Sequence, residues 1–332
     1  MSRALDPRTR AALKRAIYED TFKDIAEVLS ERYHDLLEIE FVPDGHPDID
    51  PGTTYLQEGH AIGIPKAQLV RAFQVAYRML AASRKQAKID EDGLRKATAV
   101  LLLTDPEHLT AANTRKRLIK ESASTGTNQE LLQKEKYLVD SFLTSRLHRH
   151  TKSPTIWSHR RWLMDQYTLQ GLTIDVVNDF KKVILVSAER HPRNYYAWSE
   201  ARSLIKYHTG DEEQLLSTLT EETKKWCLAH HDDISGWGFL MYLLDHRSGP
   251  MDVLEDILKL TQSFRWSNEA VWYFLRNMAT KGYVTDLFKE QLEHARETLW
   301  QTADENSLER RVLVQTRDWI SAQTSDTWPA PR

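Results

Sequence analysis

The chain has 332 residues, of which 41% are hydrophobic, so it is long enough to bury one large core or two of ordinary size. Its 45 basic and 48 acidic residues leave a net charge of −3, which excludes an overall positive field for nucleic acid, and no apolar run approaches the roughly 18 residues of a membrane span. One cysteine, Cys227, excludes an intramolecular disulfide framework and a multi-thiolate zinc site in this chain.

The N-terminal region, residues 1–66, is the least regular part of the sequence. Its first residues, MSRALDPRTR, lack the apolar core of a secretory signal, so we expect a cytoplasmic protein. A helix is predicted from about Arg8 to Tyr33. The Pro-, Gly- and Asp-rich segment from Phe41 to Lys66 is expected to be an irregular loop that either docks on a partner or moves freely, and the second interpretation is favoured.

Residues 67–325 are predicted to form a helical repeat domain. A phrase returns five times, centred at 112, 157, 198, 237 and 272, with intervals of 45, 41, 39 and 35 residues. The five copies are LTAANTRKRLI, SPTIWSHRRWL, RNYYAWSEARS, DISGWGFLMYL and SNEAVWYFLRN. Each interval fits one helical hairpin with its loops, so the phrases mark one helix of each hairpin.

A second amphipathic stretch between the phrases supports this hairpin unit. Val177, Phe180 and Ile184 fall three and four apart and share a helix face. Within the third phrase, the same spacing puts Tyr195 and Trp198 on one stripe that should face the neighbouring hairpin. A single hairpin cannot cover its apolar faces, so the sequence predicts an all-α fold, an α-solenoid crescent of stacked antiparallel helical hairpins.

The phrases RNYYAWSEAR and SPTIWSHRRW resemble the repeats of protein farnesyl- and geranylgeranyltransferase alpha subunits. The second phrase is most similar to a divergent branch, the protein prenyltransferase alpha subunit repeat-containing proteins. The resemblance covers roughly residues 100 to 285. It implies that the repeat residues Trp157, Arg160, Trp198, Trp237 and Trp272 are structural, with an inter-hairpin core favoured over a partner groove.

The resemblance also implies a function shared between two chains. Alpha subunits of this family form a heterodimer with a beta subunit, whose zinc binds the cysteine thiolate of a protein substrate with a C-terminal cysteine. An isoprenoid diphosphate supplies the lipid. We therefore expect no metal or other cofactor in this chain, zinc in the partner, and no activity from the isolated chain.

Candidate site residues come from the same resemblance. The family's lysine, five residues before the second tryptophan, corresponds to Lys152 and would assist the departing diphosphate. The neighbouring substrate-contacting positions have become Pro154 and Thr155, which departs from the family pattern. A lysine at a helix start is otherwise merely solvated, and this alternative stays open.

The third phrase keeps more of the family's pattern. Arg193 and Tyr195 join Lys152 as candidate catalytic residues, with the permanently charged Arg193 as an electrostatic clamp, and Asn194 and Tyr196 as candidate substrate-binding residues. Tyr196 stands where many family members have histidine. The competing interpretation is that Arg193 and Asn194 only cap a helix while Tyr195 packs, and both remain open.

Other polar clusters are weaker candidates. His148 and His150 diverge on a helix, and the His230–Asp233 run falls in an expected loop, so no metal site is predicted. The basic runs Arg115–Arg117 and His159–Arg161 should form solvated or interface faces, with a phosphate-binding patch as the alternative.

Two functions follow. The first is the alpha-type subunit of a heterodimeric protein prenyltransferase, and the divergent branch suggests geranylgeranyl transfer. The second is a helical-repeat scaffold that has lost prenylation, an interpretation motivated by the departures at Ala112, Pro154, Ala201 and Leu240.

Overall fold

The computed structural model describes residues 7–32, 34–49, 52–83, 90–122 and 128–324. They form two compact units that divide between Tyr207 and His208. This boundary differs from the one expected between residues 66 and 67, because the N-terminal elements pack on the first helices of the repeat region. Each unit is described separately below.

The first unit begins with a helix and a small sheet that the sequence did not predict. Helix α1 (Pro7–Ser30) ends earlier than expected, and Tyr33 lies outside the described residues. Three strands follow, in the sheet order β1-β3-β2, and these are β1 (Glu38–Val42), β2 (Leu56–Glu58) and β3 (Ala61–Pro65). Strands β1 and β3 are parallel, whereas β2 and β3 are antiparallel.

The expectation of an irregular loop at Phe41–Lys66 is therefore wrong where the segment forms strands, at 41–42, Leu56–Glu58 and Ala61–Pro65. Gly59, with a φ of 59°, and His60 form a two-residue turn between β2 and β3. Ile62 and Ile64 of β3 are buried. Turn residues around these short strands dominate the local composition, which explains why the sequence looked irregular.

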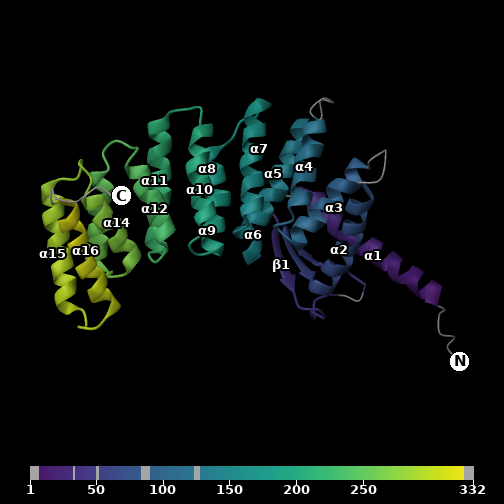
Figure 1. Cartoon of the computed structure of the whole chain (residues 1–332), viewed down its shortest axis with the longest axis horizontal. Coiled ribbons are helices and arrows are strands. Elements are labelled where there is room, and N and C mark those ends of the chain that lie inside the picture. Colours follow the sequence, from purple (N-terminus) through teal and green to yellow (C-terminus); the bar gives the residue numbers. More distant parts are fainter. Residues whose placement is uncertain (1–6, 33, 50–51, 84–89, 123–127, 325–332) are drawn as a thin grey trace, which may run out of the picture. The chain divides into compact units, whose positions relative to one another are not determined.

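The rest of the first unit is a stack of helices (Figure 1). Helices α2 (Lys66–Ser83) and α3 (Glu91–Thr104) precede the repeats. The phrase helices are α4 (Leu109–Ser122), α7 (Pro154–Leu169) and α10 (Tyr195–Leu204). Between and after them come α5 (Asn128–Thr144), α6 (His148–Thr151), α8 (Val176–Asp179), the π-helical segment η2 (Phe180–Leu185), α9 (Val186–Arg190) and the 3₁₀ turn η3 (Ile205–Tyr207).

The second unit continues the hairpin pattern with the remaining two phrases. Its phrase helices are α12 (Ile234–Leu244) and α14 (Glu269–Ala279). Its other helices are α11 (Glu212–Ala229), α13 (Met251–Ser263), α15 (Asp286–Thr302) and α16 (Leu308–Thr324). The predicted all-α, solenoid-like fold is confirmed within each unit, with the small sheet as an addition.

The phrase tryptophans form the inter-hairpin core, as expected. Trp157, Trp198, Trp237 and Trp272 are at most 2% exposed. Three of them share a second feature, because the indole Nε1 donates to the carbonyl oxygen six residues earlier: Trp157 to Thr151 at 2.9 Å, Trp237 to His231 at 3.0 Å and Trp272 to Trp266 at 2.8 Å. Each of these indoles is therefore buried with its polar atom satisfied.

Two of these carbonyl groups, those of Thr151 and His231, also accept a hydrogen bond from a side chain of the next phrase, and the Pro106 carbonyl accepts one in the same way. In three phrases the N-cap residue lies four positions before the aligned residue, and its side chain donates a hydrogen bond to a carbonyl oxygen just before the preceding phrase helix. The pairs are Ser153 to Pro106 at 3.2 Å, Asn194 to Thr151 at 2.7 Å and Asn268 to His231 at 2.8 Å. Since each link joins neighbouring phrases, the N-terminal ends of these helices are held in register along the stack.

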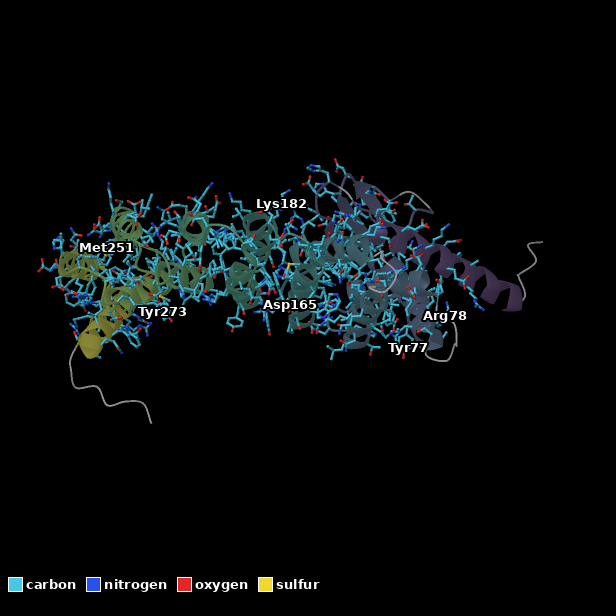
Figure 2. All side chains as sticks on the ribbon, turned by 90° about the horizontal axis from the view of Figure 1, so that it is seen from above. Tyr77, Arg78, Asp165, Lys182, Met251 and Tyr273 are labelled. Atoms are coloured by element: carbon cyan, nitrogen blue, oxygen red, sulfur yellow. The ribbon has the colours of Figure 1, made fainter. Side chains whose placement is uncertain are left out.

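Carboxylates hold the opposite ends of the phrase helices. Asp165, labelled in Figure 2, accepts a hydrogen bond from the Tyr207 hydroxyl at 2.7 Å, and Asp245 accepts one from Tyr283 at 2.8 Å. Burial and the adjacent carboxylate raise the pKa of both tyrosines. Both tyrosines therefore stay protonated as donors, and each unit repeats the same link between two phrases.

Arg160 occupies the centre of a buried ionic network in the first unit. Its side chain is 0% exposed, and its guanidinium binds Asp140 of α5 at 2.7 Å and Asp179 of α8 at 2.6 Å. A third contact reaches Glu200 of α10 at 3.3 Å. Lys136 bridges the first two carboxylates at 2.6 and 2.8 Å. One arginine thus joins three successive hairpins.

The basic runs were expected to form solvated or interface faces, and three of their members, Arg115, His159 and Arg160, are instead buried within the first unit. Arg115, which holds the position of Arg160 in the first phrase, is buried and binds Glu135 through two nitrogen atoms at 2.8 and 2.5 Å. The buried His159 lies 2.8 Å from the same carboxylate. Arg115 and His159 counteract the burial of Glu135 and hold its pKa well below the ordinary range. Sequence alone could not reveal these carboxylates, because they come from the intervening helices.

We predict that Arg160→Leu destabilises the first unit by about 3–5 kcal/mol, because three carboxylates then lose their central cation in a buried site. The matched variant is Arg161→Leu, whose side chain is 42% exposed and binds only Glu200, and it should cost less than about 1 kcal/mol. Urea unfolding of the full chain measures both. Equal losses for the two variants would contradict the central role of Arg160.

We also predict that stability falls as the pH drops from about 6.5 towards 4. Burial lowers the pKa of His150 from 6.5 to about 4, so the unfolded chain takes up this proton before the folded chain does. The contribution is complete above pH 6.5 and is lost as the pH approaches 4. Burial also lowers the pKa of His159, which adds to the effect in the same direction.

Thermal denaturation between pH 7.5 and 4.5 tests this pH dependence. The His150→Leu variant should show a smaller fall in melting temperature over this range, because it cannot take up the proton. A fall as steep as that of the unsubstituted chain would show that His150 does not contribute.

Candidate functional site

The predicted site residues lie at one edge of the first unit, where α6 ends and α10 begins. Lys152 is the C-cap of α6 and is exposed. Within the described residues, no ion pair or hydrogen bond of its ammonium group is recorded. Arg193 is also exposed and precedes the N-cap of α10. Both cations therefore face solvent at the start of a phrase.

A buried hydrogen bond brings these two segments together. The Asn194 amide nitrogen donates to the carbonyl oxygen of Thr151 at 2.7 Å. Thr151 directly precedes Lys152, and Asn194 directly follows Arg193. The link therefore places the backbone of the two candidate cations side by side on the same edge.

Asn194 is itself fully occupied by structural contacts. Its side chain is buried, its Oδ1 accepts from the Ala197 amide at 3.3 Å, and its Nδ2 also donates to the Ser187 hydroxyl at 3.0 Å. It thus caps α10 and bridges two hairpins, and does not face a substrate. This corrects the expectation that Asn194 binds substrate.

Arg193 adopts an uncommon backbone conformation. Its φ is 58°, in the left-handed region that costs about 1–2 kcal/mol for a residue with a Cβ atom. Its carbonyl oxygen accepts from the Tyr195 amide at 2.9 Å, which closes a tight turn before α10. The turn presents the Arg193 side chain at the edge, next to the start of the helix.

Tyr195 and Tyr196 supply aromatic surface beside the cations. Tyr195 is 65% exposed, so the expectation that it shares the buried stripe of Trp198 is wrong. The buried face of α10 is instead formed by Ala197, Trp198, Ala201 and Leu204. Tyr196 is half-buried, and the two tyrosine rings meet edge to face with their centroids 5.8 Å apart. Tyr195 is therefore available to a ligand, as a site residue must be.

Sequence reasoning missed His191 at this edge. Its ring meets that of His148 edge to face, with the centroids 5.5 Å apart. His150 points the other way, into the core, with its Nε2 atom 3.0 Å from the Leu102 carbonyl oxygen. The expected divergence of His148 and His150 is confirmed, and only the hairpin stacking could pair His148 with His191.

The described residues offer no metal-binding group of three or more His, Cys, Asp or Glu side chains. Burial raises the pKa of the Cys227 thiol well above its ordinary value, which keeps it protonated. Across the parts of the chain that the structure describes, no helix is both long and apolar enough to cross a membrane. Among the described residues, the edge therefore offers the exposed cations Lys152 and Arg193 and the exposed ring of Tyr195.

Two family descriptions match the sequence over the hairpins that form this edge. The protein prenyltransferase alpha subunit repeat matches residues 140–167, and the ECM9 middle domain matches residues 156–264. The first range contains Trp157 and Arg160. Residues 140–167 of the chain match the protein prenyltransferase alpha subunit repeat. The resemblance noted in the sequence is confirmed.

Curated proteins are similar to the chain over about half its length. Protein prenyltransferase alpha subunit repeat-containing protein 1 of Homo sapiens is 30% identical over 183 residues, and protein 1-B of Xenopus laevis is 28% identical over 185. Protein ECM9 of Saccharomyces cerevisiae is 30% identical over 183 residues. These matches cover 50%, 50% and 54% of this chain and 43%, 40% and 47% of the respective relatives. The matched region is therefore less than half of each relative.

We predict that Asn194→Ala destabilises the first unit by about 2–3 kcal/mol, because it removes a helix cap and leaves buried polar groups without their partner. Lys152→Ala should change the free energy of unfolding by less than about 0.5 kcal/mol, since its side chain is exposed. Denaturant unfolding compares the two. A neutral Asn194→Ala variant would disprove the bridging role.

Proposed function

We propose that the chain is an alpha-type subunit of a heterodimeric protein prenyltransferase. In this proposal it scaffolds a zinc-bearing beta subunit and helps to bind an isoprenoid diphosphate during transfer to the C-terminal cysteine of a protein substrate. Geranylgeranyl is the isoprenoid that the divergent branch favours. The reaction takes place in the cytoplasm.

The observation that carries the proposal is that one buried hydrogen bond joins the residues directly beside Lys152 and Arg193. The Thr151–Asn194 hydrogen bond fixes the backbone beside both residues, while their side chains stay exposed. Prenyl transfer forms a sulfur–carbon bond and breaks the carbon–oxygen bond to the diphosphate, so negative charge accumulates on the leaving group. Two cations positioned in advance stabilise that charge.

The arrangement also suits a division of work between two chains. Arg193 offers a fork of donors to the diphosphate oxygens, and Lys152 offers a compact charge. Tyr195 and Tyr196 lie beside them and present hydroxyl groups and rings. In this proposal the zinc that binds the substrate thiolate belongs to the beta subunit.

A scaffold without prenyl transfer is the second candidate. Specific observations favour it: Asn194 is occupied by structural contacts, and Pro154 stands at a position where the family contacts substrate. In this alternative the stacked hairpins bind another protein, and Lys152 and Arg193 take no part in prenyl transfer.

The test is reconstitution of the full chain with candidate beta subunits, followed by incorporation of labelled geranylgeranyl or farnesyl diphosphate into a protein with a C-terminal cysteine. We predict that Lys152→Ala and Arg193→Ala each reduce transfer at least about tenfold without loss of the heterodimer, because each removes charge stabilisation. Lys152→Arg should restore part of the activity.

Lys225→Ala serves as the matched control, since this lysine is exposed in the second unit and should leave transfer unchanged. Full activity of both site variants would remove Lys152 and Arg193 from the reaction. Stable pairing with a beta subunit but no transfer to any acceptor would favour the scaffold, and no pairing with any beta subunit would contradict the proposal.

A further inference from the structure

A second cationic surface lies on the phrase helices of the first two repeats, apart from the Lys152–Arg193 edge. Lys116 and Lys120 are four residues apart on α4 and share a face. Both ammonium groups approach the ring of Trp162 on α7, at 5.6 and 6.0 Å from its centroid. Lys116 is half-buried, Lys120 is exposed and Trp162 is partly exposed. Two like charges therefore converge on one accessible aromatic ring.

Nothing in the described residues neutralises this pair. No carboxylate of the described residues lies within ion-pair distance of either ammonium group, whereas Lys96 and Lys134, also in the first unit, are paired with acidic residues. Burial and the charge of Lys120 lower the pKa of Lys116, which shows that the environment opposes its charge. A bound anion would relieve that cost.

The carboxylates that contact the basic runs of α4 and α7 are already engaged. Glu135 binds Arg115 and lies 2.8 Å from His159, and Glu200 binds Arg160 and Arg161. Glu135 cannot turn to the lysines without taking its carboxylate away from the buried Arg115. A negative charge that relieves the cost at Lys116 would therefore come from outside this network.

We propose that Lys116, Lys120 and Trp162 form a docking surface for an acidic, extended segment of a partner protein. Charge complementarity identifies the partner's chemistry. Lysines at this helical spacing have Cβ atoms about 5–6 Å apart, and alternate side chains of an extended chain are about 6.6 Å apart, so two carboxylates can meet both ammonium groups.

The Trp162 ring adds a flat surface for the apolar parts of the segment. The cations are lysines, which bind as point charges, and not arginines with the planar fork that matches a single phosphate group. This favours carboxylates from two side chains over one phosphate. The docking surface does not depend on prenyl transfer, because it shares no residue with the Lys152–Arg193 edge.

The test is fluorescence anisotropy with the full chain and a labelled peptide of alternating Glu and Gln residues. The peptide should bind, its affinity should fall with added salt, and the all-Gln peptide should not bind. Lys116→Gln/Lys120→Gln should weaken binding at least about tenfold, and Trp162→Leu should weaken it severalfold while both charges remain.

The matched control is Lys225→Gln/Lys259→Gln, which removes two exposed lysines from the second unit and should bind as the unsubstituted chain does. Circular dichroism confirms that each variant is folded. Equal binding by the control and the Lys116/Lys120 variant would overturn the docking surface. Displacement of the peptide by inorganic phosphate below millimolar concentration would overturn the acidic-segment assignment in favour of a phosphate site.

Prenyl transfer by the reconstituted heterodimer is measured in parallel on the same variants. The proposed enzyme function fails if the reconstituted pair transfers no prenyl group to any acceptor, whatever the peptide does. The docking surface fails on the peptide measurement alone, so the two outcomes are distinguishable.

Discussion

The first unit depends on a buried arginine that is shared between hairpins. Arg160 contacts carboxylates from α5, α8 and α10, and its own helix is α7. A buried ionic network is a weak source of net stability, but it penalises any arrangement that leaves one charge unpaired. The spacing between these hairpins is thereby restricted. The surrounding apolar core, including Trp157 and Trp198, packs around this arrangement.

The hydrogen bonds at the helix starts also restrict the position of the backbone beneath exposed residues. Asn194 reaches the Thr151 carbonyl, and the two residues beside this link are Lys152 and Arg193. A rigid backbone beneath two exposed cations reduces the reorganisation needed when an anion binds. The repeat thus explains how a chain whose described residues form no metal site could still contribute to a reaction: it would place charge and leave the metal chemistry to a partner.

Much of the fold could be predicted from the sequence, because the phrase tryptophans recur at hairpin intervals and the N-cap residues precede them. Less of the site could be predicted. Asn194 was expected to bind substrate. Its hydrogen bond to the Thr151 carbonyl oxygen, 43 positions earlier in the chain, forms only when the hairpins stack, so the sequence could not reveal it. Arg115 was expected to lie on a solvated or interface face. Its partner Glu135 is on another helix, so this ion pair also could not be read from the sequence. The strands of the first unit were missed since turn residues dominate that segment.

The central claim is that the Lys152–Arg193 edge contacts the isoprenoid diphosphate in a heterodimer. A photoreactive isoprenoid diphosphate analogue, bound to the reconstituted pair and mapped by mass spectrometry, tests this contact directly. The account predicts labelled peptides within residues 148–196 of this chain, with labelling suppressed by excess unlabelled diphosphate. Labelling confined to the beta subunit would contradict it.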